Sequence, residues 1–191
     1  MTPPYRKPKD IKSTLPIQTM TLTGLMTALI CLLAPISIQL PFSPIPLSLA
    51  TFVIYFVIII LGQKRSFLSV LLYLLLGFAG LPVFSSFTGG VGKLLGPTGG
   101  YLIGYLFLPL ICGFFVDNWQ GKILPCLLGL FLGTLVCYLF GTIWLSLQAK
   151  LNLFAAFSSA VLPFLFFDVL KIFLSYCLSC QIRKRLNRAG L

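Results

Sequence analysis

Residues 160–180 read AVLPFLFFDVLKIFLSYCLSC, an apolar run in which only Asp168 and Lys171 are charged. An α-helix rises about 1.5 Å per residue, so about 20 apolar residues cross the hydrocarbon core of a bilayer, which is about 30 Å thick. The run therefore predicts a transmembrane helix that holds an acid and a base within the membrane.

Outward from this run, the rest of the chain is also mostly apolar. Hydrophobic residues make up 58% of the 191 residues and charged residues 9%, whereas a soluble domain carries about 25% charged residues. Six apolar segments can be delimited, at about 17–40, 49–61, 67–83, 101–116, 123–147 and 153–182. The sequence therefore predicts an all-α integral membrane protein, a bundle of six transmembrane helices. We expect this membrane domain to cover residues 16–182, between a basic N-terminal segment at 1–15 and a basic tail at 183–191.

The basic residues are concentrated on alternate connections between these segments. With the N-terminus inside, all but three of the 14 Lys and Arg residues lie on the inner side: Arg6, Lys7, Lys9, Lys12, Lys64, Arg65, Lys122, Arg183, Lys184, Arg185 and Arg188. The outer connections hold only Lys93 and Lys150, and Lys171 lies within a span. Because Lys and Arg accumulate in cytoplasmic loops, we expect both termini in the cytoplasm and a multi-pass protein of the cytoplasmic (inner) membrane.

The missing residue types exclude most catalytic and metal chemistry. The chain has no His and no Glu, and its acids are Asp10, Asp117 and Asp168. Metal sites and general acid–base catalysis mostly need His, paired carboxylates or clustered Cys. The CxxC of Cys177 and Cys180 lies in an apolar helix without a second pair, so we interpret it as structural. An enzyme, a resident cofactor and a metal are therefore not expected. Nucleic acid is not an expected partner either, because the basic residues form short runs between apolar segments.

Asp168 and Lys171 are the first candidate functional residues. Each charge placed at mid-membrane costs about 2.5–3.5 kcal/mol on an insertion scale. Their spacing of three residues puts them on one helix face, where they can partly neutralise each other. The pair could hold a polar group of a ligand or could only fix helix packing. A charge this deep favours the binding interpretation.

The glycine-rich connection from Phe84 to Gly100, FSSFTGGVGKLLGPTGG, is the second candidate. Its glycines allow positive φ angles and close approach of the backbone to a ligand. It is not a phosphate-binding P-loop, because Phe87 and Leu94 stand where that motif requires Gly and Ser or Thr. A mobile lid over a ligand and a tightly folded plug both stay open.

Small residues recur at four-residue spacing in three pairs, Gly24/Ala28, Gly100/Gly104 and Gly129/Gly133. Such pairs let membrane helices approach closely. Packing inside the bundle is the simplest explanation of each pair taken alone.

Four stretches of the sequence resemble the BioY family, the substrate-binding S components of energy-coupling-factor (ECF) biotin transporters. They are PFSPIPLSLATF at 41–52, GQKRSFLSVLLYLLLGFAGLPVF at 62–84, GGVGKLLGPTGGYLIGY at 89–105 and FDVLK at 167–171. The resemblance implies a six-helix S-component fold, biotin bound near the outer face, and assembly with a transmembrane coupling subunit and ATP-binding subunits. ATP hydrolysis would belong to those partners, because this chain has no Walker motif.

The resemblance also implies roles for particular residues. The family's Asp-x-x-Lys motif corresponds to Asp168 and Lys171. The family's AxxxA-type docking motif corresponds to Gly24 and Ala28. Thr27 and Cys31 offer an alternative register for docking on a neighbouring face. With the glycine-rich connection included, the candidate substrate-binding residues are Asp168, Lys171, Phe84, Gly89, Gly90, Lys93, Thr98, Gly99 and Tyr101.

The chemistry of biotin suits such a site. Its ureido group has two N–H donors and a carbonyl acceptor, which a carboxylate and an ammonium can bind. Its carboxylate needs a cation or a group of donors, for which Lys93 and the amides of the connection are candidates. Two other functions stay open: an S component for another vitamin, and a membrane scaffold or assembly protein without a transport role.

The charge distribution leads to a prediction about topology. We expect a cysteine beside Lys93 to react with a membrane-impermeant thiol reagent in intact cells, and one beside Arg185 to stay unlabelled. Single-cysteine variants labelled before and after cell lysis would measure this. The reverse pattern would overturn the predicted orientation.

Overall fold

The computed structural model describes residues 16–39, 41, 45–119 and 122–188. The expected N-terminal segment 1–15 and residues 189–191 of the expected tail lie outside this described part. The elements in chain order are α1 (Pro16–Leu33), β1 (Ser37–Ile38), β2 (Leu47–Ser48), α2 (Ala50–Leu61), α3 (Gln63–Phe78), the 3-10 turn η1 (Ser85–Phe87), α4 (Val91–Leu94), α5 (Gly99–Asn118), α6 (Ile123–Ala149), α7 (Leu153–Ala160) and α8 (Leu162–Arg188).

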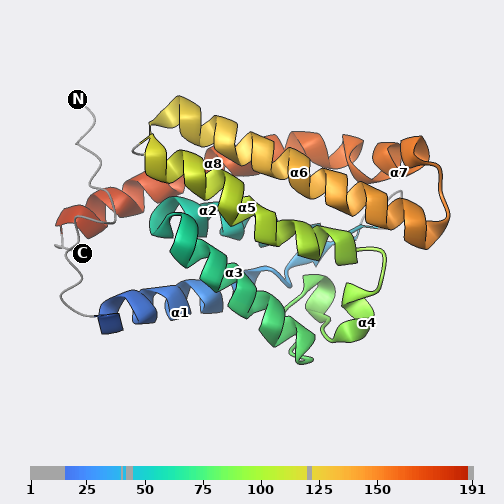
Figure 1. Ribbon diagram of the computed structural model, residues 1–191, viewed down its shortest axis with the longest axis horizontal. Helices are drawn as coiled ribbons and strands as arrows, with labels where there is room; N and C mark the ends of the chain where they lie inside the picture. The colour runs from blue at the N-terminus through green and yellow to red at the C-terminus, as the bar shows by residue number, and fades with distance from the viewer. Residues whose placement is uncertain (1–15, 40, 42–44, 120–121, 189–191) are drawn as a thin grey trace.

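The protein is a bundle of helices (Figure 1). Many large apolar side chains are exposed on its surface, among them Leu32, Leu124 and Phe166. Within the described residues, three helical stretches are long and apolar enough to cross a membrane: Gly99–Asn118, Ile123–Ala149 and Leu162–Ile182. Ile17–Leu33 and Ala50–Leu61 are apolar helices below that length. The long helices and the exposed apolar side chains together describe a multi-pass membrane protein.

The long helices run back and forth between two ends of the bundle (Figure 1). One end holds the start of α1, the junction of α2 and α3, the end of α5 and the end of α8. The opposite end holds the β1–β2 pair, η1, α4 and α7. This path agrees with the alternation of connections read from the sequence.

Two of the six predicted segments have different limits in the structure because of proline. The segment predicted at 153–182 is divided into α7 and α8 at Val161. Pro163 lacks an amide hydrogen and is best tolerated in the first turn of a helix, so a new helix begins at Leu162. The first segment ends at Leu33 rather than at residue 40, because Pro35 cannot continue it. At the other end of the chain α8 continues to Arg188, so residues 183–188 extend the helix.

The junction of α2 and α3 depends on one glycine. Gly62 has φ 73°, a conformation that side chains disfavour, and a Cβ there would collide with the Asp117 carboxylate. That carboxylate accepts a hydrogen bond from the amide of Gln63 at 3.0 Å, where α3 begins. Asp117 is therefore a structural residue that ties the end of α5 to the α2–α3 junction.

Glycines let α5 and α6 pack in close contact. A Cβ on Gly100 would meet Trp144, and a Cβ on Gly104 would meet Cys137. The Gly129/Gly133 pair of α6 faces Phe115 and Cys112 of α5 in the same way. Both pairs therefore serve packing inside the bundle.

The third small-residue pair, on α1, is different. Gly24 and Ala28 are exposed, and a Cβ on Gly24 would have no neighbour within 4 Å. This pair does not pack inside the bundle.

The α5–α6 contact leads to a prediction about stability. In Gly104→Leu, the Cβ alone would lie 2.8 Å from Cys137 Sγ and 3.0 Å from its Cα. We expect a loss of about 1–3 kcal/mol, the usual cost of overpacking, seen as a lower unfolding temperature of the detergent-solubilised protein. Gly24→Leu is the matched control and should leave that temperature unchanged. Equal stability of the two variants would contradict the packing role.

Candidate functional site

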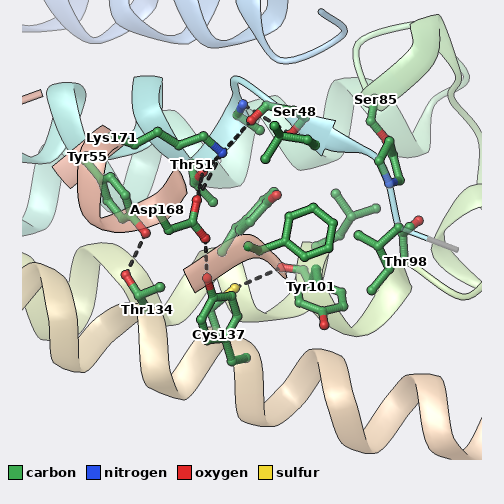
Figure 2. A pocket seen from close by; sticks show the side chains of 18 of the residues that line it. Ser48, Thr51, Tyr55, Ser85, Thr98, Tyr101, Thr134, Cys137, Asp168 and Lys171 are labelled. Atoms are coloured by element: carbon green, nitrogen blue, oxygen red, sulfur yellow. Dashed lines mark hydrogen bonds and ion pairs between the residues drawn. The ribbon is translucent and has the colours of Figure 1, made fainter. Parts of the chain in front are cut away.

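A pocket lies inside the bundle between α2, α5, α6 and α8, and residues 45–48 line one side of it (Figure 2). Its empty volume is about 690 Å³, including the mouth. The lining residues are Ile45, Pro46, Leu47, Ser48, Ala50, Thr51, Tyr55, Tyr73, Ser85, Thr98, Tyr101, Leu102, Tyr105, Thr134, Cys137, Tyr138, Phe164, Asp168 and Lys171. A concave, mostly apolar site with a few converging polar groups is the usual form of a small-molecule site.

Asp168 and Lys171 form the ion pair that their spacing predicted. Lys171 Nζ lies 3.0 Å from Asp168 Oδ1, and the two side chains are exposed by only 12% and 7%. The pair is shielded from the surrounding lipid and faces the pocket. It therefore tethers neighbouring elements and contributes to the pocket at the same time.

The three protons of the Lys171 ammonium are all donated to the protein. The acceptors are Ser48 O at 2.8 Å, Thr51 Oγ1 at 3.1 Å and Asp168 Oδ1 at 3.0 Å. An ammonium has three donors and no acceptor, so no donor remains for a ligand in this state. Lys171 thus ties β2 and α2 to α8 and fixes the carboxylate beside it.

Within the described part of the chain, the Asp168 carboxylate keeps one free acceptor position. Its Oδ1 accepts from Lys171 and, at 3.4 Å, from Thr51. Its Oδ2 accepts from the Tyr138 hydroxyl at 2.5 Å. An ionised carboxylate offers about four lone-pair positions, so Oδ2 can accept one more hydrogen bond. A ligand N–H in the pocket would fit this position.

Beside the carboxylate, a buried hydroxyl pair links α2 to α6 (Figure 2). The Thr134 hydroxyl donates to Leu130 O at 2.7 Å, so the Tyr55 hydroxyl must donate to Thr134, 2.6 Å away. Both hydroxyls are therefore satisfied within the protein. Apolar and aromatic side chains cover the remaining walls, including Tyr73, Tyr101, Tyr105 and Phe164.

Four of the nine predicted substrate-binding residues line the pocket: Asp168, Lys171, Thr98 and Tyr101. The other five, Phe84, Gly89, Gly90, Lys93 and Gly99, do not line it.

Phe84, Gly89 and Gly99 have packing roles, and Gly90 provides a positive φ angle. Phe84 is fully buried and meets Tyr73 edge-on, with ring centroids 5.6 Å apart, so it supports the pocket wall from behind. Gly90 has φ 83° and donates its amide to Gly77 O at 2.7 Å. A Cβ on Gly89 would meet the Leu81 carbonyl, and one on Gly99 would meet the Leu94 carbonyl.

Lys93 lies on the short helix α4, at the end of the bundle that also holds η1 and α7, and is half-buried (Figure 1). Burial lowers the pKa of its ammonium below the usual value, because desolvation disfavours the charged form. Its amine is not part of the pocket wall.

The glycine-rich connection is folded and is tied down on two sides. Ser86 donates its amide to Pro35 O at 3.0 Å and to Ser37 Oγ at 2.9 Å, which joins the connection to β1. On the other side, Trp144 Nε1 donates to Gly96 O at 2.9 Å and Gln148 Nε2 to Leu95 O at 2.6 Å. These contacts are those of a folded plug, and movement of the connection as a lid stays a prediction.

Several residues that complete the site could hardly be predicted from the sequence. Thr51 and Tyr138 are polar residues in mostly apolar helices, which is a detectable but common signal. Ser48 contributes a main-chain carbonyl, which any residue type could provide. Among the described residues, no group of three or more His, Cys, Asp or Glu could hold a metal ion.

A membrane bundle that encloses a pocket with one buried acid–base pair is typical of a solute-binding membrane protein. A model of the BioY family matches residues 7–188. The chain belongs to the BioY family, and it is a transport protein rather than an enzyme.

Relatives and a solved structure agree with this assignment. The chain is 32% identical over 158 residues to the biotin transporter BioY2 of Lactococcus lactis subsp. cremoris, covering 83% of this chain and 86% of the relative. It is 39% identical over 151 residues to a probable biotin transporter BioY of Pyrococcus horikoshii, covering 79% of this chain and 87% of the relative. It is also similar to the crystal structure of the S-component for biotin from an ECF-type ABC transporter, with a TM-score of 0.79 and 34% identity. The match covers 88% of this chain and 92% of the chain in that structure.

Proposed function

We propose that this chain binds biotin with high affinity and serves as the substrate-specific subunit of an ECF-type transporter that takes biotin up across the cytoplasmic membrane. The observation that carries the proposal is the free acceptor position on buried Asp168, in a pocket otherwise walled by aromatic and aliphatic side chains. The names of the relatives and of the similar solved structure supply the ligand and the transporter class.

The pocket and biotin are chemically complementary. A ureido N–H can donate to Asp168 Oδ2, and this charge-assisted bond is stronger than one between neutral groups. The bicyclic ring and the valeryl chain are apolar, and side chains such as Tyr73 and Phe164 give them apolar contacts.

Lys171 acts indirectly in this proposal. Its ammonium is saturated by Ser48, Thr51 and Asp168, so it positions the carboxylate rather than touching the ligand. The sequence had offered the ammonium as a direct donor to a ligand oxygen, and the contacts favour the positioning role.

Concentrative uptake needs energy from other proteins, and the exposed face of α1 is the proposed docking surface for the coupling subunit. Gly24 and Ala28 are exposed one helical turn apart and let a partner helix approach closely. The alternative register is less suitable. Thr27 is only 5% exposed, and its hydroxyl lies within hydrogen-bonding distance of Thr23 O at 2.9 Å and Ser69 O at 3.4 Å. Residue 27 therefore faces α3 rather than a partner.

Binding can be tested on the purified protein. We expect mass spectrometry of the wild-type protein to find biotin, and Asp168→Asn to bind biotin about tenfold to a hundredfold more weakly, because a charge-assisted bond is lost. Lys171→Met should weaken binding in the same direction, since the carboxylate loses its anchor. Asp117→Asn is the control, because Asp117 lies outside the pocket.

The contrary outcomes separate the alternatives. A different bound vitamin would indicate an S component of another specificity. A folded wild-type protein that carries and binds no small molecule would indicate a scaffold. Wild-type affinity in folded Asp168→Asn would mean that the ion pair is structural only.

Docking is tested by Ala28→Trp. The indole should hold the partner helix away, so we expect co-purification with the coupling subunit and ATP-driven uptake to be lost while biotin binding persists. Leu139→Trp on α6, also at an exposed apolar position, is the control and should leave assembly intact. Undiminished assembly of Ala28→Trp would place the docking surface elsewhere.

A further inference from the structure

An apolar groove lies between α6 and α8, apart from the pocket. Its lining consists of Leu124, Leu127, Leu128 and Phe131 of α6 and Val169, Ile172 and Phe173 of α8. Its empty volume is about 650 Å³, including the mouth. Among the described residues, this lining shares no member with that of the pocket around Asp168. The groove therefore has no role in the function as derived so far.

The groove forms because α6 and α8 pack mainly against other helices. On α8, Lys171 and Ser175 donate to main-chain carbonyls of β2 and α2 at 2.8 Å and 2.9 Å. On α6, Gly129 and Gly133 face α5. The Tyr138 hydroxyl joins α6 to α8 at the carboxylate, and the groove lies between that contact and the start of α6.

The shape of the groove suits a lipid acyl chain. Ile172 is buried at its floor, whereas Leu124, Leu128 and Phe173 are 50–71% exposed, so the groove opens toward the surrounding lipid. A partner helix needs small residues for close approach, and the groove is bordered by bulky side chains. A flexible acyl chain can lie between such side chains, which makes it the more suitable occupant.

Positive charge is concentrated at the end of the bundle toward which the groove runs. Lys122 is exposed and stands two residues before Leu124, about 3 Å along the axis of α6. Helix α8 ends where α6 begins (Figure 1), and its sequence there carries Arg183, Lys184 and Arg185. Basic clusters beside membrane helices attract anionic lipid headgroups.

The acid that the structure describes at this end does not cancel the charge. Asp117 of α5 lies there, and its Oδ2 already accepts from the amide of Gln63 at 3.0 Å. Lys64 and Arg65, at the start of α3, add two further positive charges. The end of the bundle beside the groove is therefore strongly positive, which complements an anionic headgroup and not a zwitterionic one.

We infer that an anionic phospholipid binds between α6 and α8, with an acyl chain in the groove and its phosphate beside Lys122 and the basic end of α8. Asp168 and Lys171 line the pocket, and Val169 and Ile172 line the groove. The bound chain therefore packs against the helix that carries the buried ion pair. The inference does not rest on biotin binding.

The experiment compares two lipids with the same acyl chains, dioleoylphosphatidylglycerol and dioleoylphosphatidylcholine, by native mass spectrometry of the delipidated full chain in detergent. Wild type should bind the anionic lipid about tenfold more tightly, and high salt should reduce this preference. Lys122→Gln should weaken binding of the anionic lipid about fivefold, the usual contribution of one basic residue near a membrane surface, and leave the zwitterionic lipid unchanged.

Matched variants test the place of each part of the lipid. Lys64→Gln removes another exposed lysine at the same end, on α3, and should leave the affinity for the anionic lipid unchanged. Leu128→Trp fills the groove, so the lipid adduct should be lost. Leu139→Trp, at a similarly exposed position of α6 outside the groove lining, should keep it. Circular dichroism and the unfolding temperature report whether each variant is folded.

Several outcomes would overturn the inference. Equal affinity of wild type for the two lipids would leave only non-specific contact with lipid, and this measurement needs no variant. Equal affinities of Lys122→Gln and Lys64→Gln would remove the headgroup from Lys122. An unchanged adduct in folded Leu128→Trp would place the acyl chain elsewhere. A dimer of wild type that dissociates in Leu128→Trp would assign the groove to a second copy of the chain.

Discussion

The ion pair between Asp168 and Lys171 is the interaction on which the rest of the structure depends. Each charge would be costly in the membrane if it stood alone, so the surrounding elements must meet its hydrogen-bonding needs. They do so from three directions: β2 supplies the Ser48 carbonyl, α2 the Thr51 hydroxyl and α6 the Tyr138 hydroxyl. Satisfying one pair therefore brings three parts of the chain to one face of α8, and the space that they enclose is the pocket.

The close packing of α5 on α6 completes this arrangement. Glycines at Gly100, Gly104 and Gly133 remove the side chains that would hold the two helices apart. As a result, α5 forms one wall of the pocket and its N-terminus borders the end away from Asp168. Packing that looks purely structural thus decides where a positive helix end lies relative to a buried carboxylate.

Few polar groups of the pocket are left without a partner in the protein, as is expected inside a membrane. The saturated Lys171 ammonium and the satisfied Tyr55–Thr134 pair leave few polar positions for a ligand, among them one lone pair on Asp168. Few but well-placed polar groups in an apolar cavity favour selectivity, because a ligand that leaves such a group unpaired loses affinity. The exposed small-residue face of α1 lies outside the pocket lining, so binding and docking can be altered separately.

The sequence by itself determined the membrane class, the approximate positions of the helices and the Asp168–Lys171 pair. Apolar length and charge spacing are local properties, and the family motifs lie in contiguous stretches. The tertiary structure decided the rest. It placed Thr98 and Tyr101 in the pocket, left Phe84, Gly89, Gly90, Lys93 and Gly99 out of its lining, and divided the last predicted segment at Val161. Which glycines approach a ligand and which only make room for a helix depends on what lies opposite each one. That information arises only when distant segments pack together, as when the carbonyl of Ser48 meets the ammonium of Lys171.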